Sequence, residues 1–382
     1  MKSLLFILCI ALLYSCKQKE NTKYGSAAAV GGFNYRQLTS NEREFYTAGI
    51  EHLYDSILKK HNFNGSILVA KNGEVLLEDN HGYSNPVTKD TITSSTTFHL
   101  ASVSKTFTGM AVMKLWEENK LSLEDSLQTF FPEFPYKGIT VRMLLNHRSG
   151  LPNYVYFMTQ DRAWRRKIAT NNDMLQFMID KKPALYSYPD RGFHYCNTNF
   201  ALLALIVEKV SGQTFPEYMK NTIFTPLGMT NTFVFSKQDS ADYKPSYQPN
   251  NRPFPLESID GIYGDKNVYS TVNDMFLWDQ AIYSNRVVSQ STYEEATKPY
   301  SLERPSVHNY GLGWRLMMLP NSKIVYHNGW WHGNNTVFTR LVNDTATIII
   351  LSNRFNKAIY SGMKIGTVFA NSKKTELQKP LE

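Results

Sequence analysis

Alternating hydrophobic and polar residues near both ends of the chain predict β-hairpins. Residues 65–78 form two β-rich runs on either side of Asn72-Gly73, a pair that favours a two-residue hairpin turn. A second pair of β-rich runs, 336–342 and 345–352, flanks a turn at Asn343-Asp344. These patterns predict strands of one antiparallel sheet that is built from both ends of the chain.

Between the hairpins, hydrophobic residues recur at helical spacing. Residues 102–119 have a broad apolar face, and residues 199–210 are almost entirely apolar until they end at Ser211-Gly212. Strands at both ends with helices between them predict an α+β fold. We expect an antiparallel sheet flanked by helices, with a mostly helical lobe inserted at about residues 120–255.

The N-terminus has the pattern of an export signal. A lysine precedes an apolar run at residues 4–14, which is too short to span a bilayer as a helix. The run ends at Leu13-Tyr-Ser-Cys16, which resembles a bacterial lipobox and predicts a signal peptide over 1–15 and a lipid on Cys16; an ordinary secretory signal is the alternative. The rest of the chain is expected to divide into a lipidated N-terminus and flexible tether over 16–40, one domain over 41–372 and a frayed tail over 373–382.

Composition and charge narrow the range of partners. The 382 residues have a formal net charge of +8, but the basic residues are scattered, which does not favour nucleic-acid binding. Cys9 falls in the signal and Cys16 carries the lipid, so Cys196 remains alone and no disulfide is expected. Zinc-peptidase and nucleotide-binding motifs are lacking, so we expect no metal and no cofactor. We expect an exported monomer that its lipid holds at a bacterial membrane, in the periplasm or at the cell surface.

Three short motifs indicate acyl transfer by a serine: Ser102-Val-Ser-Lys105, Tyr195-Cys-Asn197 and His327-Asn-Gly329. A neutral serine hydroxyl needs a base within hydrogen-bond reach. Residues three apart on a helix share a face, which places Lys105 beside Ser102. The N–H groups at the start of the same helix point toward any oxyanion formed there. The other Ser-x-x-Lys sequences, at Ser56 and Ser361, lack the apolar lead-in of residues 98–101 and the long apolar helix.

Residues 98–105 resemble the nucleophile segment of the serine β-lactamase-related family, which includes class C β-lactamases, penicillin-binding DD-peptidases and related esterases. Further segments resemble motifs of that family in the family's order, at residues 139–152, 193–199, 226–229, 264–274, 326–330 and 350–353. The resemblance covers about residues 60–355. It implies a β-lactamase/transpeptidase-like fold.

The resemblance implies a role for each matched residue. Ser102 is the acylated nucleophile, Lys105 accepts its proton or tunes Tyr195, and Tyr195 acts in turn as base and acid. Asn197 holds Lys105 and binds a substrate amide carbonyl. The backbone N–H groups of Ser102 and Trp330 are expected to form the oxyanion hole. Gly329 is expected to let substrate lie close against an edge strand, and the side chain of His327 is a further expected substrate contact.

Two positions depart from the family pattern. His327 replaces a lysine, a variant associated with peptidases and esterases more than with β-lactamases, and Asn328 replaces a hydroxyl residue that usually binds a carboxylate. We interpret His147, Ser149 and Asp265 as structural residues. We therefore predict a serine hydrolase that acts on an ester or amide, such as a peptide, a D-amino-acid compound or a β-lactam-like substrate. The alternatives are a non-catalytic lipoprotein that binds penicillin or peptidoglycan fragments, and an inactive scaffold.

Overall fold

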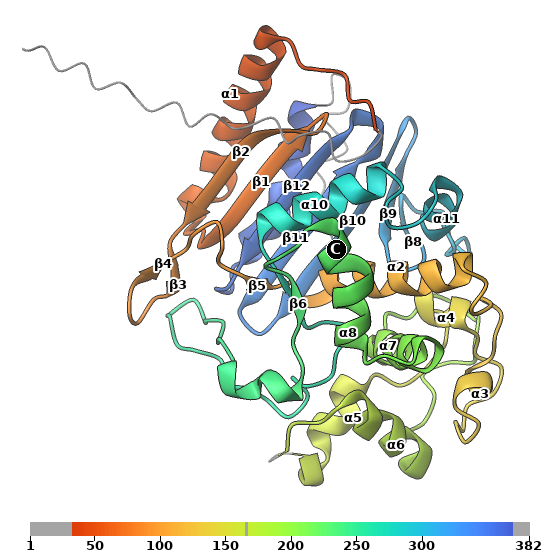
Figure 1. Cartoon of the computed structure of the whole chain (residues 1–382). Helices are drawn as coiled ribbons and strands as arrows, with labels where there is room; N and C mark the ends of the chain where they lie inside the picture. The colour runs from red at the N-terminus through yellow and green to blue at the C-terminus, as the bar shows by residue number, and fades with distance from the viewer. Residues whose placement is uncertain (1–32, 165–166, 370–382) are drawn as a thin grey trace, which may run out of the picture.

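A seven-stranded antiparallel sheet forms the centre of the fold (Figure 1). The computed structural model describes residues 33–164 and 167–369. The strands follow the order β2-β1-β12-β11-β10-β9-β8. Their bounds are Gly65–Lys71 (β1), Glu74–His81 (β2), His308–Tyr310 (β8), Arg315–Leu319 (β9), Ser322–Trp331 (β10), Asn334–Leu341 (β11) and Ala346–Ser352 (β12). Because β1 pairs directly with β12, both ends of the chain build the sheet, and the predicted α+β class is confirmed.

Both predicted hairpins are present. Asn72 and Gly73 have φ angles of 50° and 73°, the two positive values that a type I′ turn between β1 and β2 requires. The second hairpin joins β11 to β12 through the 3-10 turn Val342–Asp344, which ends at Thr345 in a left-handed conformation. The second connection is therefore longer than the two-residue turn that the sequence predicted.

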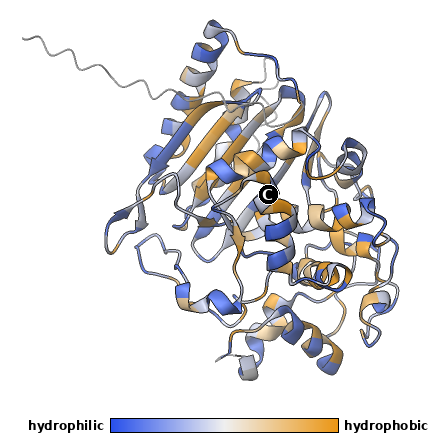
Figure 2. Cartoon of the chain, in the orientation of Figure 1, coloured by the Kyte–Doolittle hydropathy of each residue, from blue (hydrophilic) through white to orange (hydrophobic). Residues whose placement is uncertain are grey.

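Helices cover both faces of the sheet, so strands β1, β11 and β12 are buried along their whole length. Helix α1 (Ser40–Ile57) and the 3-10 segment η7 (Lys357–Val368) pack on one face, where they meet Ile348 and Ile350 of β12. The alternate residues Ile349 and Leu351 point to the other face and join the core of the helical lobe. Figure 2 shows the hydrophobic residues concentrated in these strands and in the helices beside them.

The helical lobe packs around two apolar helices, α2 (Ser104–Glu117) and α7 (Asn197–Ser211), which contact each other. Helix α7 ends at Gly212, whose φ of 71° suits glycine at a helix C-terminus. The smaller helices are α3 (Leu127–Phe130), α4 (Val141–Leu145), α5 (Tyr154–Gln160), α6 (Asn171–Lys181), α8 (Phe215–Met219) and α9 (Thr225–Leu227). Two more helices, α10 (Val272–Tyr283) and α11 (Gln290–Ala296), follow in the chain.

A three-stranded sheet connects the lobe to the main sheet. Its strands, in the order β5-β7-β6, are Phe98–His99 (β5), Val268–Ser270 (β7) and Phe233–Val234 (β6). A further pair, β3 (Tyr83–Asn85) and β4 (Asp90–Thr91), extends from the end of β2. Strand β5 runs directly into the segment that contains Ser102, so this small sheet fixes the start of the site.

The expected export signal, Cys16 and the tail 373–382 lie outside the described residues. Within the described ranges, no helix combines the length and apolar character that a membrane crossing requires. Cys196 is a free, buried thiol.

Candidate active site

Ser102 lies in a single 3-10 turn between strand β5 and helix α2. The turn spans Ala101–Val103 and α2 begins at Ser104, so the helix starts two residues later than the sequence predicted. Ala101 is fully buried and has a φ of 49°, a left-handed conformation that costs a residue with a side chain about 1 kcal/mol or more. His99 Nδ1 accepts a hydrogen bond of 3.0 Å from the Ala101 N–H and holds this turn in place.

Lys105 Nζ is the point where the site residues meet. It donates a hydrogen bond to Ser102 Oγ at 3.3 Å, and others to Asn197 Oδ1 and the Asp265 carbonyl oxygen, both at 2.8 Å. The same nitrogen lies 4.9 Å from the centroid of the Tyr195 ring. Lys105 is completely buried. The structure therefore brings together Ser102 from the 3-10 turn, Lys105 from α2, Tyr195 from the segment before α7 and Asn197 from the first position of α7.

His147 positions the segment that carries Tyr195. Its Nδ1 accepts a hydrogen bond of 3.1 Å from the Cys196 N–H, and its carbonyl oxygen accepts one of 2.8 Å from the His194 N–H. The rings of His147 and Tyr195 lie 4.4 Å apart. Burial and then the charge of Lys105 lower the pKa of His147 well below its ordinary value, so the ring is neutral and available as an acceptor. This geometry agrees with a structural role for His147.

The third motif lies on β10, where successive side chains point to opposite faces. Tyr326, Asn328, Gly329, Trp330 and Trp331 line the cleft at the site. His327 lies between them in the chain and is completely buried on the face of the helical lobe, and it does not line the cleft. The His327 ring nevertheless lies 6.4 Å from the Tyr195 ring, and its expected contact with substrate stays a prediction.

The hydrogen bonds of His327 indicate one tautomer. Its Nδ1 donates to the Asn328 carbonyl oxygen at 2.8 Å, and its Nε2 accepts from the Tyr310 hydroxyl at 3.1 Å. Burial, and then the charges of Arg315 and Lys105, lower the pKa of His327 well below its ordinary value. A neutral His327 thus fixes Tyr310 beneath the site.

Gly329 lets β10 pack closely against the turn that carries the nucleophile. A Cβ atom at this position would lie 2.2 Å from Thr336 Oγ1 and 2.4 Å from the Leu100 carbonyl oxygen. Gly329 also lines the cleft, so the expected close approach of substrate to this strand stays a prediction. Strand β10 is also an interior strand, not an edge strand, but β9 pairs only with Ser322–Tyr326. The second half of β10, with Trp330, is thus left without a strand partner on that side in the described part of the chain.

The site opens into a cleft of about 1140 Å³. Trp330 stands at its rim with 61% of its surface exposed, and its ring packs against Phe355 at 5.6 Å. Trp331 Nε1 donates to Asp260 Oδ1 at 2.8 Å and fixes another part of the wall. Aromatic side chains form much of the lining, namely Tyr156, Tyr195, Phe254, Tyr326, Trp330, Trp331, Phe355 and Tyr360.

Arg315 and Tyr360 are among the residues of this cleft that the sequence analysis missed. The Arg315 guanidinium lies 5.3 Å from the centroid of the Tyr195 ring, and no carboxylate pairs with it among the described residues. The Tyr360 hydroxyl of η7 donates to the Gly329 carbonyl oxygen at 2.9 Å and accepts from Asn335 Nδ2 at 2.8 Å. Neither residue belongs to a motif of fixed spacing, so no pattern in the sequence indicated them.

The described side chains include no group of three or more histidine, cysteine, aspartate or glutamate residues that is arranged to bind a metal ion. The groups that meet at Lys105 are the hydroxyl of Ser102, the ring of Tyr195 and the amide of Asn197.

A sheet covered by helices on both faces, with serine, lysine and tyrosine meeting at its edge, defines the class of β-lactamase/transpeptidase-fold proteins. The Beta-lactamase family matches residues 50–362. Penicillin-binding protein 4* of Bacillus subtilis (strain 168) is 35% identical over 324 residues, which are 80% of this chain and 71% of that protein. The chain therefore belongs to the Beta-lactamase family.

Solved structures agree with this assignment. The penicillin binding protein from Bacillus halodurans superimposes with a TM-score of 0.71 and 25% identity, over 81% of this chain and 96% of that one. The D-amino acid amidase from Ochrobactrum anthropi SV3 has the same fold, with a TM-score of 0.66 and 23% identity over 81% of this chain and 91% of its own.

Proposed function

We propose that this protein is a monomeric serine hydrolase that forms an acyl-enzyme on Ser102. The observation that carries the proposal is the position of Lys105 Nζ, 3.3 Å from Ser102 Oγ and 4.9 Å from the centre of the Tyr195 ring. A serine hydroxyl becomes a useful nucleophile only when a base lies within reach. Membership of the Beta-lactamase family gives the same proposal independent support.

The proposed reaction has two stages. Ser102 Oγ attacks the carbonyl carbon, and its proton passes to Tyr195 or Lys105 and then to the leaving group as the bond to that group breaks. Tyr195 next takes a proton from water, the water oxygen attacks the acyl carbon, and the proton returns to Ser102 as the acid product leaves. The backbone N–H groups of Ser102 and Trp330 stabilise the oxyanion in both stages. Asn197 orients Lys105 throughout.

We propose that the substrate is an ester or an amide, of a peptide, a D-amino-acid compound or a β-lactam-like compound. The aromatic lining of the cleft favours a substrate with an apolar group, because aromatic side chains contribute large contact areas. Arg315 favours a substrate that also carries a negative charge, because its guanidinium has no carboxylate partner within the described residues.

Turnover assays on three kinds of substrate test the proposal. We expect wild-type protein to hydrolyse at least one of an activated acyl ester, a D-amino-acid peptide and a penicillin, and Ser102→Ala to hydrolyse none. Ser56→Ala is the matched control, because Ser56 also lies three residues before a lysine but its hydroxyl only donates to the Leu53 carbonyl oxygen. Loss of turnover in both variants, or in neither, would contradict the proposal.

A penicillin- or peptidoglycan-binding protein without turnover is the second candidate function. The name of the Bacillus subtilis relative favours it, since that protein is called a penicillin-binding protein. The two functions differ in the time course of product release. A binder releases at most one equivalent of product per protein and stays acylated, whereas a hydrolase continues beyond one equivalent.

We also propose that a lipid on Cys16 anchors the protein to a bacterial membrane after export. The support is the apolar run that ends in Leu13-Tyr-Ser-Cys16. Fractionation of expressing cells tests it. We expect wild-type protein in the membrane fraction and Cys16→Ser in the soluble fraction, and an equal distribution of both would contradict the anchor.

A further inference from the structure

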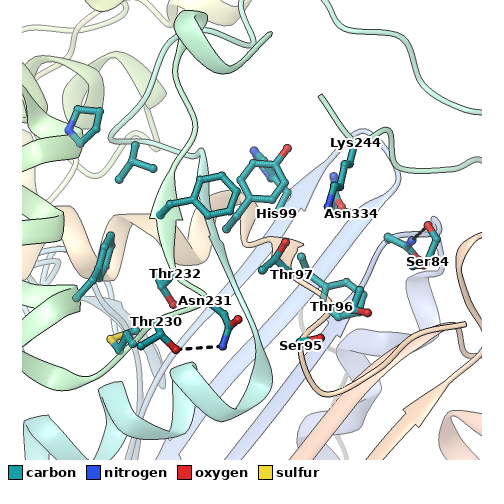
Figure 3. Close-up of a pocket in the computed structure, with 18 of the residues that line it drawn as sticks. Ser84, Ser95, Thr96, Thr97, His99, Thr230, Asn231, Thr232, Lys244 and Asn334 are labelled. Atoms are coloured by element: carbon teal, nitrogen blue, oxygen red, sulfur yellow. Dashed lines mark hydrogen bonds between the residues drawn. The ribbon is translucent and has the colours of Figure 1, made fainter. Parts of the chain in front are cut away.

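A second cavity, of about 1030 Å³, shares no lining residue with the active-site cleft. Figure 3 shows Thr230, Asn231 and Thr232 on one side of it and Ser84 and Asn334 across from them. These walls come from the segment before β6, from β3 and from the start of β11. Nothing in the proposed hydrolysis uses this cavity.

Hydroxyl and amide groups line part of the cavity, and several of them are free to bind a ligand. Within the described part of the chain, Thr97 Oγ1 has no hydrogen-bond partner. The side-chain amide nitrogens of Asn231 and Asn334 donate to neighbouring oxygens, but their side-chain oxygens have no partner among the described residues. Uncharged donors and acceptors of this kind match the hydroxyl groups of a polyol.

A rigid aromatic face lies among these polar groups. The Phe233 ring is stacked on the Tyr269 ring, with centroids 5.1 Å apart and an interplanar angle of 6°. The edge of Tyr269 in turn meets His99, at 4.9 Å and 87°. Phe233 remains 43% exposed although it is a large apolar residue. An aromatic face is electron-rich, so it attracts the polarised C–H groups on the flat side of a sugar ring.

The formal charges around the cavity cancel. Lys220 and Lys244 contribute two positive charges, and Asp90 and Glu217 contribute two negative charges. Burial lowers the pKa of His99 to about 4, so that ring is neutral near pH 7. The cavity therefore does not concentrate anions, as a phosphate or polyanion site would.

We propose that this cavity binds a neutral carbohydrate, with one sugar ring packed on Phe233 and its hydroxyl groups bonded to Thr97, Asn231 and Asn334. An aromatic platform beside unpaired hydroxyl and amide groups, without net charge, is the combination that recognises an uncharged sugar. The proposal is independent of acyl transfer at Ser102.

Calorimetric titration of the protein with neutral tetrasaccharides of glucose and of N-acetylglucosamine tests this proposal. We expect at least one to bind wild-type protein, Phe233→Ala to weaken its binding at least tenfold, and Thr97→Val to weaken it several-fold. Phe45→Ala is the matched control, because Phe45 is 63% exposed on helix α1, away from the cavity, and its removal leaves the affinity unchanged. Unchanged ester turnover in Phe233→Ala verifies that this variant is folded.

Three results would overturn the proposal. In the first, neither sugar binds wild-type protein at millimolar concentration. In the second, wild type and Phe233→Ala bind the sugar with equal affinity. In the third, a polyanion such as polyphosphate binds in a salt-sensitive way and the neutral sugars do not displace it.

Discussion

Lys105 shows how one buried side chain organises this site. Its Nζ lies within hydrogen-bond distance of a hydroxyl, an amide oxygen and a backbone carbonyl oxygen, so this buried nitrogen has three polar partners. A buried charge without such partners would cost several kcal/mol. Because the acceptors Ser102, Asn197 and Asp265 belong to three separate segments, the lysine ties those segments together as well as serving the proposed chemistry.

Replacement of Tyr195 by phenylalanine separates proton transfer from substrate binding. The variant keeps the ring that packs against His147 but loses the hydroxyl. We expect kcat to fall by about 100-fold or more, the usual contribution of a positioned acid or base, with KM changed less than twofold. Steady-state kinetics with an activated ester measures both values. A raised KM with intact kcat would contradict the proton-transfer role.

Arg315→Gln tests whether the cleft selects a negatively charged substrate. A charged hydrogen bond contributes about 1.5–3 kcal/mol, so we expect KM for an anionic substrate to rise about tenfold or more. The kcat/KM for a neutral ester should change less than twofold. Equal losses with both substrates would mean that Arg315 acts through the Tyr195 ring, 5.3 Å away, and not on the substrate's charge.

At the scale of elements, strand β10 decides which residues of its motif reach the cleft. The sequence identified His327, Gly329 and Trp330 as a group, but alternation along the strand buries His327 and exposes Trp330. Gly329 faces the turn before Ser102, where its missing side chain allows close contact between the two segments. The site therefore depends on how tightly β10 packs on this turn.

Gly329→Ala tests that packing. The added Cβ would meet Thr336 Oγ1 at 2.2 Å, so β10 has to move away from the turn that carries Ser102. We expect a loss of about 1–3 kcal/mol in unfolding free energy, measured by urea denaturation, together with most of the turnover. Gly192→Ala is the control, because the nearest atom to its Cβ would lie 3.9 Å away. Wild-type stability and activity in Gly329→Ala would contradict this account.

Local patterns predicted the elements whose signals are local. Asn72-Gly73 identified the first hairpin, and the apolar run before Gly212 identified α7. The motif around Ser102 placed Lys105 correctly beside it, because three residues on a helical segment fix that distance. Arg315 could not be predicted in this way, since its position near Tyr195 arises only when β9 pairs with β10. The burial of His327 could not be predicted from its motif either, because the direction in which a strand residue points depends on the register of the strand in the sheet.

The whole molecule joins the two chain ends in one sheet and holds the helical lobe against it. The cleft and the second cavity occupy separate places around this junction. His99 belongs to the wall of the second cavity and also holds Ala101, the residue before the nucleophile. Packing of the lobe on the sheet buries His99, His147 and His327 in environments that disfavour their charged forms.

These buried histidines make stability depend on pH. Their folded-state pKa values are lowered, His99 to about 4, whereas in the unfolded chain a histidine binds its proton near pH 6.5. The unfolded state therefore binds more protons in acid. The stability that these residues contribute is complete above about pH 6.5 and is lost as the pH falls toward about 4.

Urea denaturation at several pH values between 6.5 and 4.5 measures this effect. We expect the unfolding free energy to fall with pH by up to about 1.4 kcal/mol per pH unit for each buried histidine. In His99→Asn we expect the unfolding free energy to fall less steeply with pH, because one of the three buried histidines no longer takes up a proton on unfolding. A stability that does not change with pH in this window would contradict the neutral, buried state of these rings.

The central claim is that the groups around Lys105 make Ser102 a nucleophile. Peptide mapping by mass spectrometry, after rapid acid quench of wild-type protein with an activated ester or a penicillin, tests it most directly. The account predicts an acyl mass on the peptide that contains Ser102, absent in Ser102→Ala and short-lived in the wild type. Product formation with no acyl group on Ser102, or with the acyl group on another residue, would contradict it.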